Sequence, residues 1–183
     1  MAPSGQTTGT AVQELLRDPA SAGTWSLDAS RSTVGLRSKS VWGLVSVKGT
    51  FQQVSGSVTV SPAGEVSGTI TVAAASVETK NKKRDEHLRS ADFFDSGKYP
   101  DITVRVDRIT PDGEGVTVAG SLIVRDQTRP VSFPATVSAA SGSEVQLDAE
   151  LQVDRSDYGL TWNQMGMASM SNTLTVHAVL TKS

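Results

Sequence analysis

The chain has 183 residues, with 17 basic and 19 acidic side chains, a formal net charge of -2 and no cysteine. This length suits one domain with a sizeable core. The balanced charge excludes a global field that would gather nucleic acid or an anionic membrane, and the lack of cysteine excludes disulfides, thiolate nucleophiles and cysteine metal sites.

The N-terminal stretch, residues 1–22, is predicted to be a flexible segment with a short helix. Val12, Leu15 and Leu16 fit one face of such a helix. It would end near Pro19, which has no backbone N–H to continue it. A cap on the domain and a mobile tail both remain open as its role. No basic segment is followed by a long apolar one, so we recognise no signal peptide and expect a cytoplasmic protein.

Residues 23–183 are predicted to form one β-domain, because their apolar side chains recur at every second position. The clearest example puts Val145, Leu147, Ala149, Leu151 and Val153 on one face of a strand. Short connections rich in Gly, Pro, Asp and Ser separate roughly eight to ten such segments, as between antiparallel neighbours. The pattern predicts an all-β antiparallel sandwich or barrel.

Two connections, residues 79–101 and 155–172, are longer than the others. Long irregular loops in a compact β-domain often carry function, although a plain flexible insertion is the alternative. In the first of them, Thr79 or Asn81 can cap a two-turn helix that begins at Lys82.

That helix would carry basic residues in its first turn, at Lys82, Lys83 and Arg84. Positive charge is mildly unfavourable there because the helix dipole is already positive. A bound anion such as phosphate would reverse this penalty, so these three residues and His87 are our candidate head-group contacts. A solvated charge cluster is the competing interpretation. His87 lacks the ligand spacing of a metal site and is expected to be a hydrogen-bonding partner instead.

The interior can be either filled or hollow. Val, Ile, Ala and Leu dominate the inward faces, and only nine residues are aromatic. A barrel of about eight strands with such modest side chains can fill itself or keep room for one apolar ligand. If a lumen exists, its predicted lining includes the following side chains of the strands and of the two long connections: Val104, Phe133, Ala149, Leu151, Phe93, Phe94, Trp162, Met165, Met167 and Met170. Of the two adjacent phenylalanines, one is expected to plug into the domain and the other to cover an opening.

Five motifs along residues 25–180 occur together in one known family. The matching residues are Trp25, Leu27, Asp28 and Ser32 of a W-x-(I/L)-D-x-x-x-S start, Gly49 and Phe51 of V-x-G-x-F, Arg84, Asp85, His87, Leu88, Ser90, Asp92, Phe93, Phe94, Asp95, Tyr99 and Pro100 of RDxHLxSxDFFD…YPxI, Gly120, Leu122, Val124, Thr128 and Val131 of G-x-L-x-(I/V)…T-x-x-V, and Asp154, Arg155, Tyr158 and Gly159 of D-R-x-(D/E)-(F/Y)-G-L. By these motifs the chain resembles the YceI-like family of bacterial polyisoprenoid-binding proteins.

The resemblance implies a lipocalin-like antiparallel β-barrel of about eight strands, with a short helix in the 79–101 connection. It also implies a lumen that holds a polyprenyl phosphate, an isoprenoid quinone or a related amphiphile, for transport, storage or sequestration. We therefore expect a lipid-binding protein that is not an enzyme, with no cofactor other than bound lipid, no nucleic-acid partner and no stable membrane insertion. A filled-barrel protein-interaction module is the alternative, and pairing into a homodimer is left open.

Overall fold

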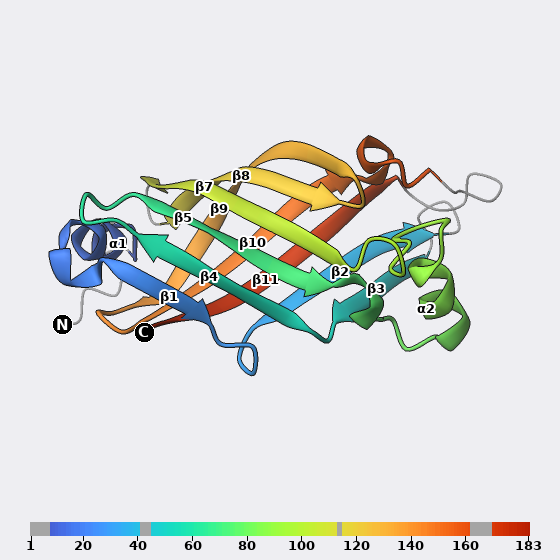
Figure 1. Cartoon of the computed structure of the whole chain (residues 1–183), viewed down its shortest axis with the longest axis horizontal. Helices are drawn as coiled ribbons and strands as arrows, with labels where there is room; N and C mark the ends of the chain where they lie inside the picture. Colours follow the sequence, from blue (N-terminus) through green and yellow to red (C-terminus); the bar gives the residue numbers. More distant parts are fainter. Residues whose placement is uncertain (1–7, 41–44, 113–114, 162–169) are drawn as a thin grey trace.

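The computed structural model describes residues 8–40, 45–112, 115–161 and 170–183. In these residues the strands form one antiparallel sheet, ordered β1-β4-β5-β7-β8-β9-β10-β11-β2-β3-β6, and β1 also pairs with β11. That extra pairing closes eight strands into a barrel, from which β2, β3 and β6 extend (Figure 1). The predicted all-β, lipocalin-like barrel is confirmed.

The strands are β1 (Gly23–Leu27), β2 (Thr33–Ser40), β3 (Val45–Phe51), β4 (Val54–Val60), β5 (Val66–Ala73), β6 (Val77–Glu78), β7 (Asp101–Asp112), β8 (Gly115–Val124), β9 (Gln127–Ala140), β10 (Glu144–Asp154) and β11 (Ser171–Lys182). The helices are α1 (Thr8–Arg17) and α2 (Lys82–Arg89), with short 3-10 turns η1 (Pro19–Ser21), η2 (Ala74–Ser76) and η3 (Arg155–Tyr158). The two α-helices lie at opposite ends of the barrel (Figure 1).

The end of the barrel near α1 is filled with side chains. Its buried residues come from seven strands and form two adjoining clusters: Trp25, Val58, Val60, Val66 and Leu180, and Val106, Val116, Val118, Ala135 and Val137. Leu16 of α1 packs against both clusters, and Leu15 packs against the first. Trp25 donates its indole N–H to the carbonyl of Ser21, at 2.9 Å. Helix α1 therefore closes this end as a cap.

Glycines occupy inward-facing positions between the filled end and the other half of the barrel. Gly68 of β5 lies opposite both Val58 and Val106, and Gly120 of β8 also lies opposite Val106. A Cβ atom at Gly120 would stand 1.8 Å from the carbonyl oxygen of Arg105. The neighbouring strand β7 has a register shift at this point, just after Val106. Such glycines and bulges let barrel strands bend sharply where backbones come close.

The short loop between β1 and β2 is held against β11 by its own polar groups. Asp28 donates its backbone N–H to the Val179 carbonyl at 2.8 Å, and the buried Ser32 hydroxyl accepts the Val179 N–H at 2.9 Å. The Asp28 carboxylate accepts hydrogen bonds from Ser30 and from Arg31, and Arg31 also pairs with Glu144 of β10 at 2.6 Å. The loop is thereby tied to two strands, β10 and β11.

This loop predicts a small acid-dependent loss of stability. Hydrogen bonds from Ser30 and then Arg31 lower the pKa of Asp28 from 3.8 to about 2. A lowered pKa means that the ionised group favours the folded state, so its contribution is complete above pH 3.8 and is lost as the pH falls through about 2. Thermal unfolding between these pH values should therefore show a steeper fall in Tm for the wild type than for Asp28→Asn. Parallel curves for the two proteins would contradict the assignment.

Candidate binding cavity

The half of the barrel near α2 encloses a cavity of about 560 Å³. Its wall is made by inward-facing apolar side chains of the strands, among them Val34, Leu36, Ile70, Val72, Ile102, Leu122, Leu174 and Val176. All four strand residues predicted to face a lumen, Val104, Phe133, Ala149 and Leu151, line it. The barrel is thus filled at one end and hollow at the other, so each of the two alternatives for the interior describes half of it.

The adjacent phenylalanines take different places at the mouth. Phe94 is 8% exposed and packs on Phe51, with 6.0 Å between ring centroids. Phe93 is half-buried and lines the cavity, with His87 edge-on to its ring at 5.1 Å. Their backbones differ in direction because the segment after α2 folds into tight turns, which return hydrogen bonds to Leu88 and Ser90. The expected arrangement, with one ring inserted and the other at the opening, agrees with this geometry.

Helix α2 is fixed over the mouth by its N-terminal residues. Asn81 caps it by accepting the Arg84 N–H at 3.0 Å. The buried carboxylate of Asp85 turns back and accepts the backbone N–H and the hydroxyl of Thr79. Arg84 then donates from Nε to the Thr79 hydroxyl at 2.7 Å and from Nη2 to the Thr79 carbonyl at 2.9 Å. Thr79 therefore does not cap the helix but joins it to the preceding strand.

The residues predicted to contact a head group divide between two sides of α2. Lys83, Arg84 and His87 line the cavity, whereas Lys82 lies in a separate outer groove. Lys82, also a candidate head-group contact, is not among the described residues of the cavity lining, because it and Lys83 project from different faces of one helical turn. His87 bonds Asp92 through Nε2 at 2.9 Å, and within the described ranges no three His, Asp or Glu side chains gather as metal ligands would.

The described residues include only part of the second long connection. Trp162, Met165 and Met167, which were predicted to border the lumen, lie outside the described residues. Met170 is half-buried and is absent from the cavity lining among the described residues. Its carbonyl oxygen instead accepts the backbone N–H of Arg155 at 2.9 Å and the Asn172 side-chain amide at 3.2 Å.

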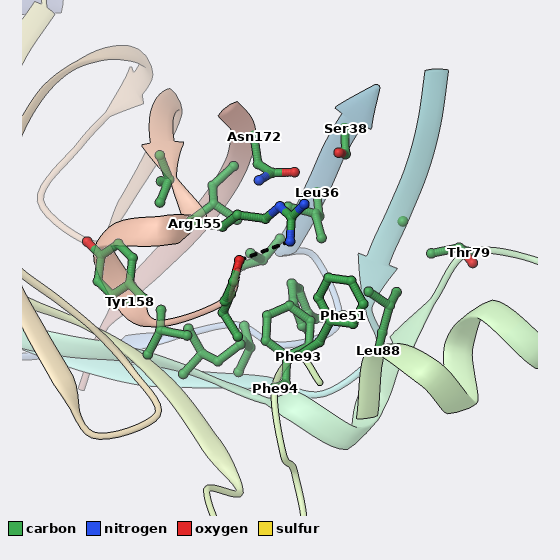
Figure 2. Close-up of a pocket in the computed structure, with 18 of the residues that line it drawn as sticks. Leu36, Ser38, Phe51, Thr79, Leu88, Phe93, Phe94, Arg155, Tyr158 and Asn172 are labelled. Carbon is green, nitrogen blue, oxygen red and sulfur yellow. Dashed lines mark hydrogen bonds between the residues drawn. The ribbon is translucent and has the colours of Figure 1, made fainter. Parts of the chain in front are cut away.

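Arg155 is a cavity residue that our prediction of site residues missed. It is 6% exposed and lines the cavity at the point where β10 passes into η3 (Figure 2). Its Nη1 donates to the carbonyl of Leu160 at 2.9 Å, and its guanidinium carbon lies 5.5 Å from the centre of the Phe93 ring. Burial lowers the pKa of Arg155, and the Asp154 carboxylate partly offsets this. A guanidinium stays charged under such conditions.

The alternation of β10 carries a signal for this arginine. Position 155 has the same parity as the inward-facing Ala149, Leu151 and Val153, so an extrapolation of the pattern by one step would have placed it inside.

Among residues 8–40, 45–112, 115–161 and 170–183, no helix has the length and apolar character needed to cross a bilayer.

A closed antiparallel barrel with an apolar cavity under one end has the architecture of the lipocalin-like binding proteins. The model of the YceI-like domain matches residues 25–181, and the chain belongs to this family. Protein YceI of Escherichia coli O17:K52:H18 is 30% identical over 129 residues, and protein YceI of Salmonella arizonae is 28% identical over 129 residues. Each match covers 66% of this chain and 66% of the relative, which is slightly under two thirds of the relative's own length.

Solved structures show the same barrel. BcnA of Burkholderia cenocepacia superposes with a TM-score of 0.75 at 26% identity, covering 84% of this chain and 98% of BcnA. A polyisoprenoid-binding domain from Saccharophagus degradans, implicated in plant cell wall breakdown, superposes with a TM-score of 0.71 at 20% identity, covering 87% of this chain and 98% of that domain. The Campylobacter jejuni YceI protein gives 0.68 at 23% identity, with 76% and 87% covered.

Proposed function

We propose that this protein is a non-catalytic carrier or storage protein whose cavity holds the apolar chain of an amphiphilic lipid. The observation that carries the proposal is the cavity of about 560 Å³ with its largely aliphatic wall. Such a volume lies within the range of about 300–1,000 Å³ that is usual for small-molecule sites. Water in a space of this kind finds few polar partners, and an apolar chain therefore replaces it favourably.

The ends of the cavity suggest how the lipid would lie. The filled half of the barrel, with Phe133 and Ala149 at its border, closes the inner end. Polar and charged side chains, including Lys83, Arg84 and His87, gather at the α2 end. A chain that enters past α2 would keep its head group among these side chains and its apolar tail against the strands. This direction avoids the burial of an unpaired polar group among aliphatic side chains.

The ligand class is proposed as a polyisoprenoid, a polyprenyl phosphate or an isoprenoid quinone. Membership of the YceI-like family supports this class, together with the barrel shared with the polyisoprenoid-binding domain of Saccharophagus degradans. The width of the cavity is set by the strands of the barrel and not by pockets shaped for one ligand. A cavity of this kind can hold an unbranched or methyl-branched chain.

Native mass spectrometry of the freshly purified protein, followed by solvent extraction, tests the proposal. We expect a stoichiometric adduct of lipid mass that extraction removes, and rebinding when the stripped protein is incubated with geranylgeranyl phosphate or a quinone. A protein that stays free of adducts before and after these incubations would contradict lipid binding. That result would favour the alternative, a barrel that recognises a protein partner through its surface.

A further inference from the structure

We propose that the filled half of the barrel limits the length of the lipid tail, so that the cavity selects prenyl chains up to about the length of a geranylgeranyl group and disfavours much longer ones. Phe133 is the side chain that contributes most to this limit. The inference rests on the proposed lipid-binding function and adds the length of tail that the cavity accepts.

Three side chains form the floor of the cavity and belong to both halves of the barrel. Val104, Phe133 and Ala149 line the cavity, and each also packs against the buried cluster that contains Val118. Leu16 of the capping helix α1 packs against the same cluster from the other side. Protein interiors of this kind are close-packed. A tail that reaches the floor therefore meets packed side chains and not a channel through the barrel.

Phe133 is the largest of the three floor residues and the only one with a ring. It lies on β9, where it pairs with the inward-facing Val118 of β8, and it is half-buried because part of its surface faces the cavity. Val104 and Ala149 have smaller side chains, so the Phe133 ring supplies most of the volume that separates the cavity from the filled half. Loss of the ring would therefore deepen the cavity.

The side wall of the cavity is made by paired strands. From β4 through β11 to β3, each strand is hydrogen-bonded to its neighbours in the sheet. At the turn between β3 and β4, Gln52 donates its backbone N–H to the Ser76 carbonyl, and the Gln53 carbonyl accepts the N–H of Ala73, both at 3.0 Å. The part of a tail that exceeds the cavity would therefore lie at the α2 mouth, in contact with water.

The volume of the cavity sets the number of carbon atoms that it can enclose. A hydrocarbon carbon takes about the volume of one water molecule in the liquid, about 30 Å³, so a cavity of about 560 Å³ holds about 19 carbons. This number is close to that of a geranylgeranyl chain. The limit applies to extended and folded tails alike, because it depends on volume. Each further isoprene unit would stay in water, which is unfavourable in proportion to the apolar area exposed.

Transfer from vesicles tests the inference on the full chain, because a bilayer offers every tail apolar surroundings. Delipidated protein is incubated with phosphatidylcholine vesicles that contain equal amounts of farnesol, geranylgeraniol, geranylfarnesol and solanesol, in order of increasing length. Once the loading no longer changes with time, the vesicles are removed and the bound prenols are extracted and quantified by mass spectrometry. We expect farnesol and geranylgeraniol to load within about threefold of each other, geranylfarnesol about tenfold less and solanesol lower by about a hundredfold or more.

Phe133→Ala tests the floor in the same experiment. The lost ring has nearly as many carbon atoms as one isoprene unit, so the ratio of geranylfarnesol to geranylgeraniol should rise about fivefold or more. Phe133→Leu keeps part of the floor and should move this ratio in the same direction by a smaller factor. Ser132→Ala is the control, because Ser132 is the preceding residue of β9 and is exposed on its outer face, so the ratio should not change.

The outcomes separate the inference from the function on which it rests. If none of the prenols loads, the proposed lipid-binding function itself is refuted. Equal loading of solanesol and geranylgeraniol by the wild type would overturn the length limit and leave lipid binding intact, and this comparison needs no substitution. A length limit that is the same in the wild type, Phe133→Ala and Phe133→Leu would overturn the role of Phe133.

Discussion

Gly120→Ala should destabilise the barrel by about 3 kcal/mol, at the upper end of the usual cost of overpacking. The cause is space, because the new Cβ would lie 1.8 Å from the Arg105 carbonyl oxygen and 2.9 Å from its carbon. Both atoms belong to the backbone of β7, so no side-chain rotation can relieve the overlap. The paired strands would have to separate beside Val106, between the filled and the hollow halves of the barrel.

Urea unfolding followed by circular dichroism measures this effect. Gly97→Ala is the matched control, because a Cβ there meets no atom within 4 Å and its stability should change by less than about 0.5 kcal/mol. If Gly120→Ala and Gly97→Ala unfold at the same urea concentration, the close approach of β7 and β8 at Gly120 is incorrect.

Most of the barrel could be predicted from local sequence because its signal is local. Side chains of a strand alternate between two faces, and the spacing of residues 145 to 153 therefore indicates the inward face of β10 without knowledge of its partners. The closure of the sheet into a barrel could not be predicted in this way. It depends on the pairing of Trp25, Ser26 and Leu27 with the C-terminal residues of β11, and these contacts lie more than 150 positions apart in the chain.

The division of the interior into a filled and a hollow half also escapes a strand-by-strand analysis. Val145 and Leu147 pack in the filled half, while Leu151 and Val153 face the cavity, although all four look alike in the sequence. The difference lies in the side chains that these residues face across the interior of the barrel. Trp25 and helix α1 occupy one end, whereas the side chains described at the other end line the cavity and do not fill it. Volume inside a barrel is a property of all its strands together.

The candidate site was predicted in part for a similar reason. The charged segment of α2 attracts notice as an interruption of the β pattern, and Lys83, Arg84 and His87 do line the cavity. Arg155 sits in a connection that we interpreted through its methionines, and its single positive charge has no unusual neighbours in sequence. The alternation of β10 places it inside, but its contact with Phe93, more than 60 positions earlier, could not be predicted from the sequence.

Ala149→Phe should abolish most lipid loading while the barrel still folds. Ala149 is half-buried, borders both the cavity and the filled half, and pairs with the small Ala135 on β9 and with Val176 on β11. A phenyl ring added there projects into empty apolar space rather than into packed atoms, so it buries its own surface without overpacking. It also occupies the volume that the end of a long tail would fill. We expect the Kd for geranylgeraniol to rise at least tenfold, about 1.4 kcal/mol.

Gln152→Phe provides the comparison on the same strand. Position 152 has the opposite parity and is exposed on the outer face, so the same ring there adds size and hydrophobicity without entering the barrel. Lipid loading of Gln152→Phe should stay within about twofold of the wild type. The free energies of unfolding of both variants, measured by urea denaturation, should remain within about 1 kcal/mol of the wild-type value. Equal loading by Ala149→Phe and the wild type would mean that the tail does not occupy this half of the barrel. Equal loss in both variants would mean that the ring acts through the outer surface, where a partner rather than a lipid would then have to bind.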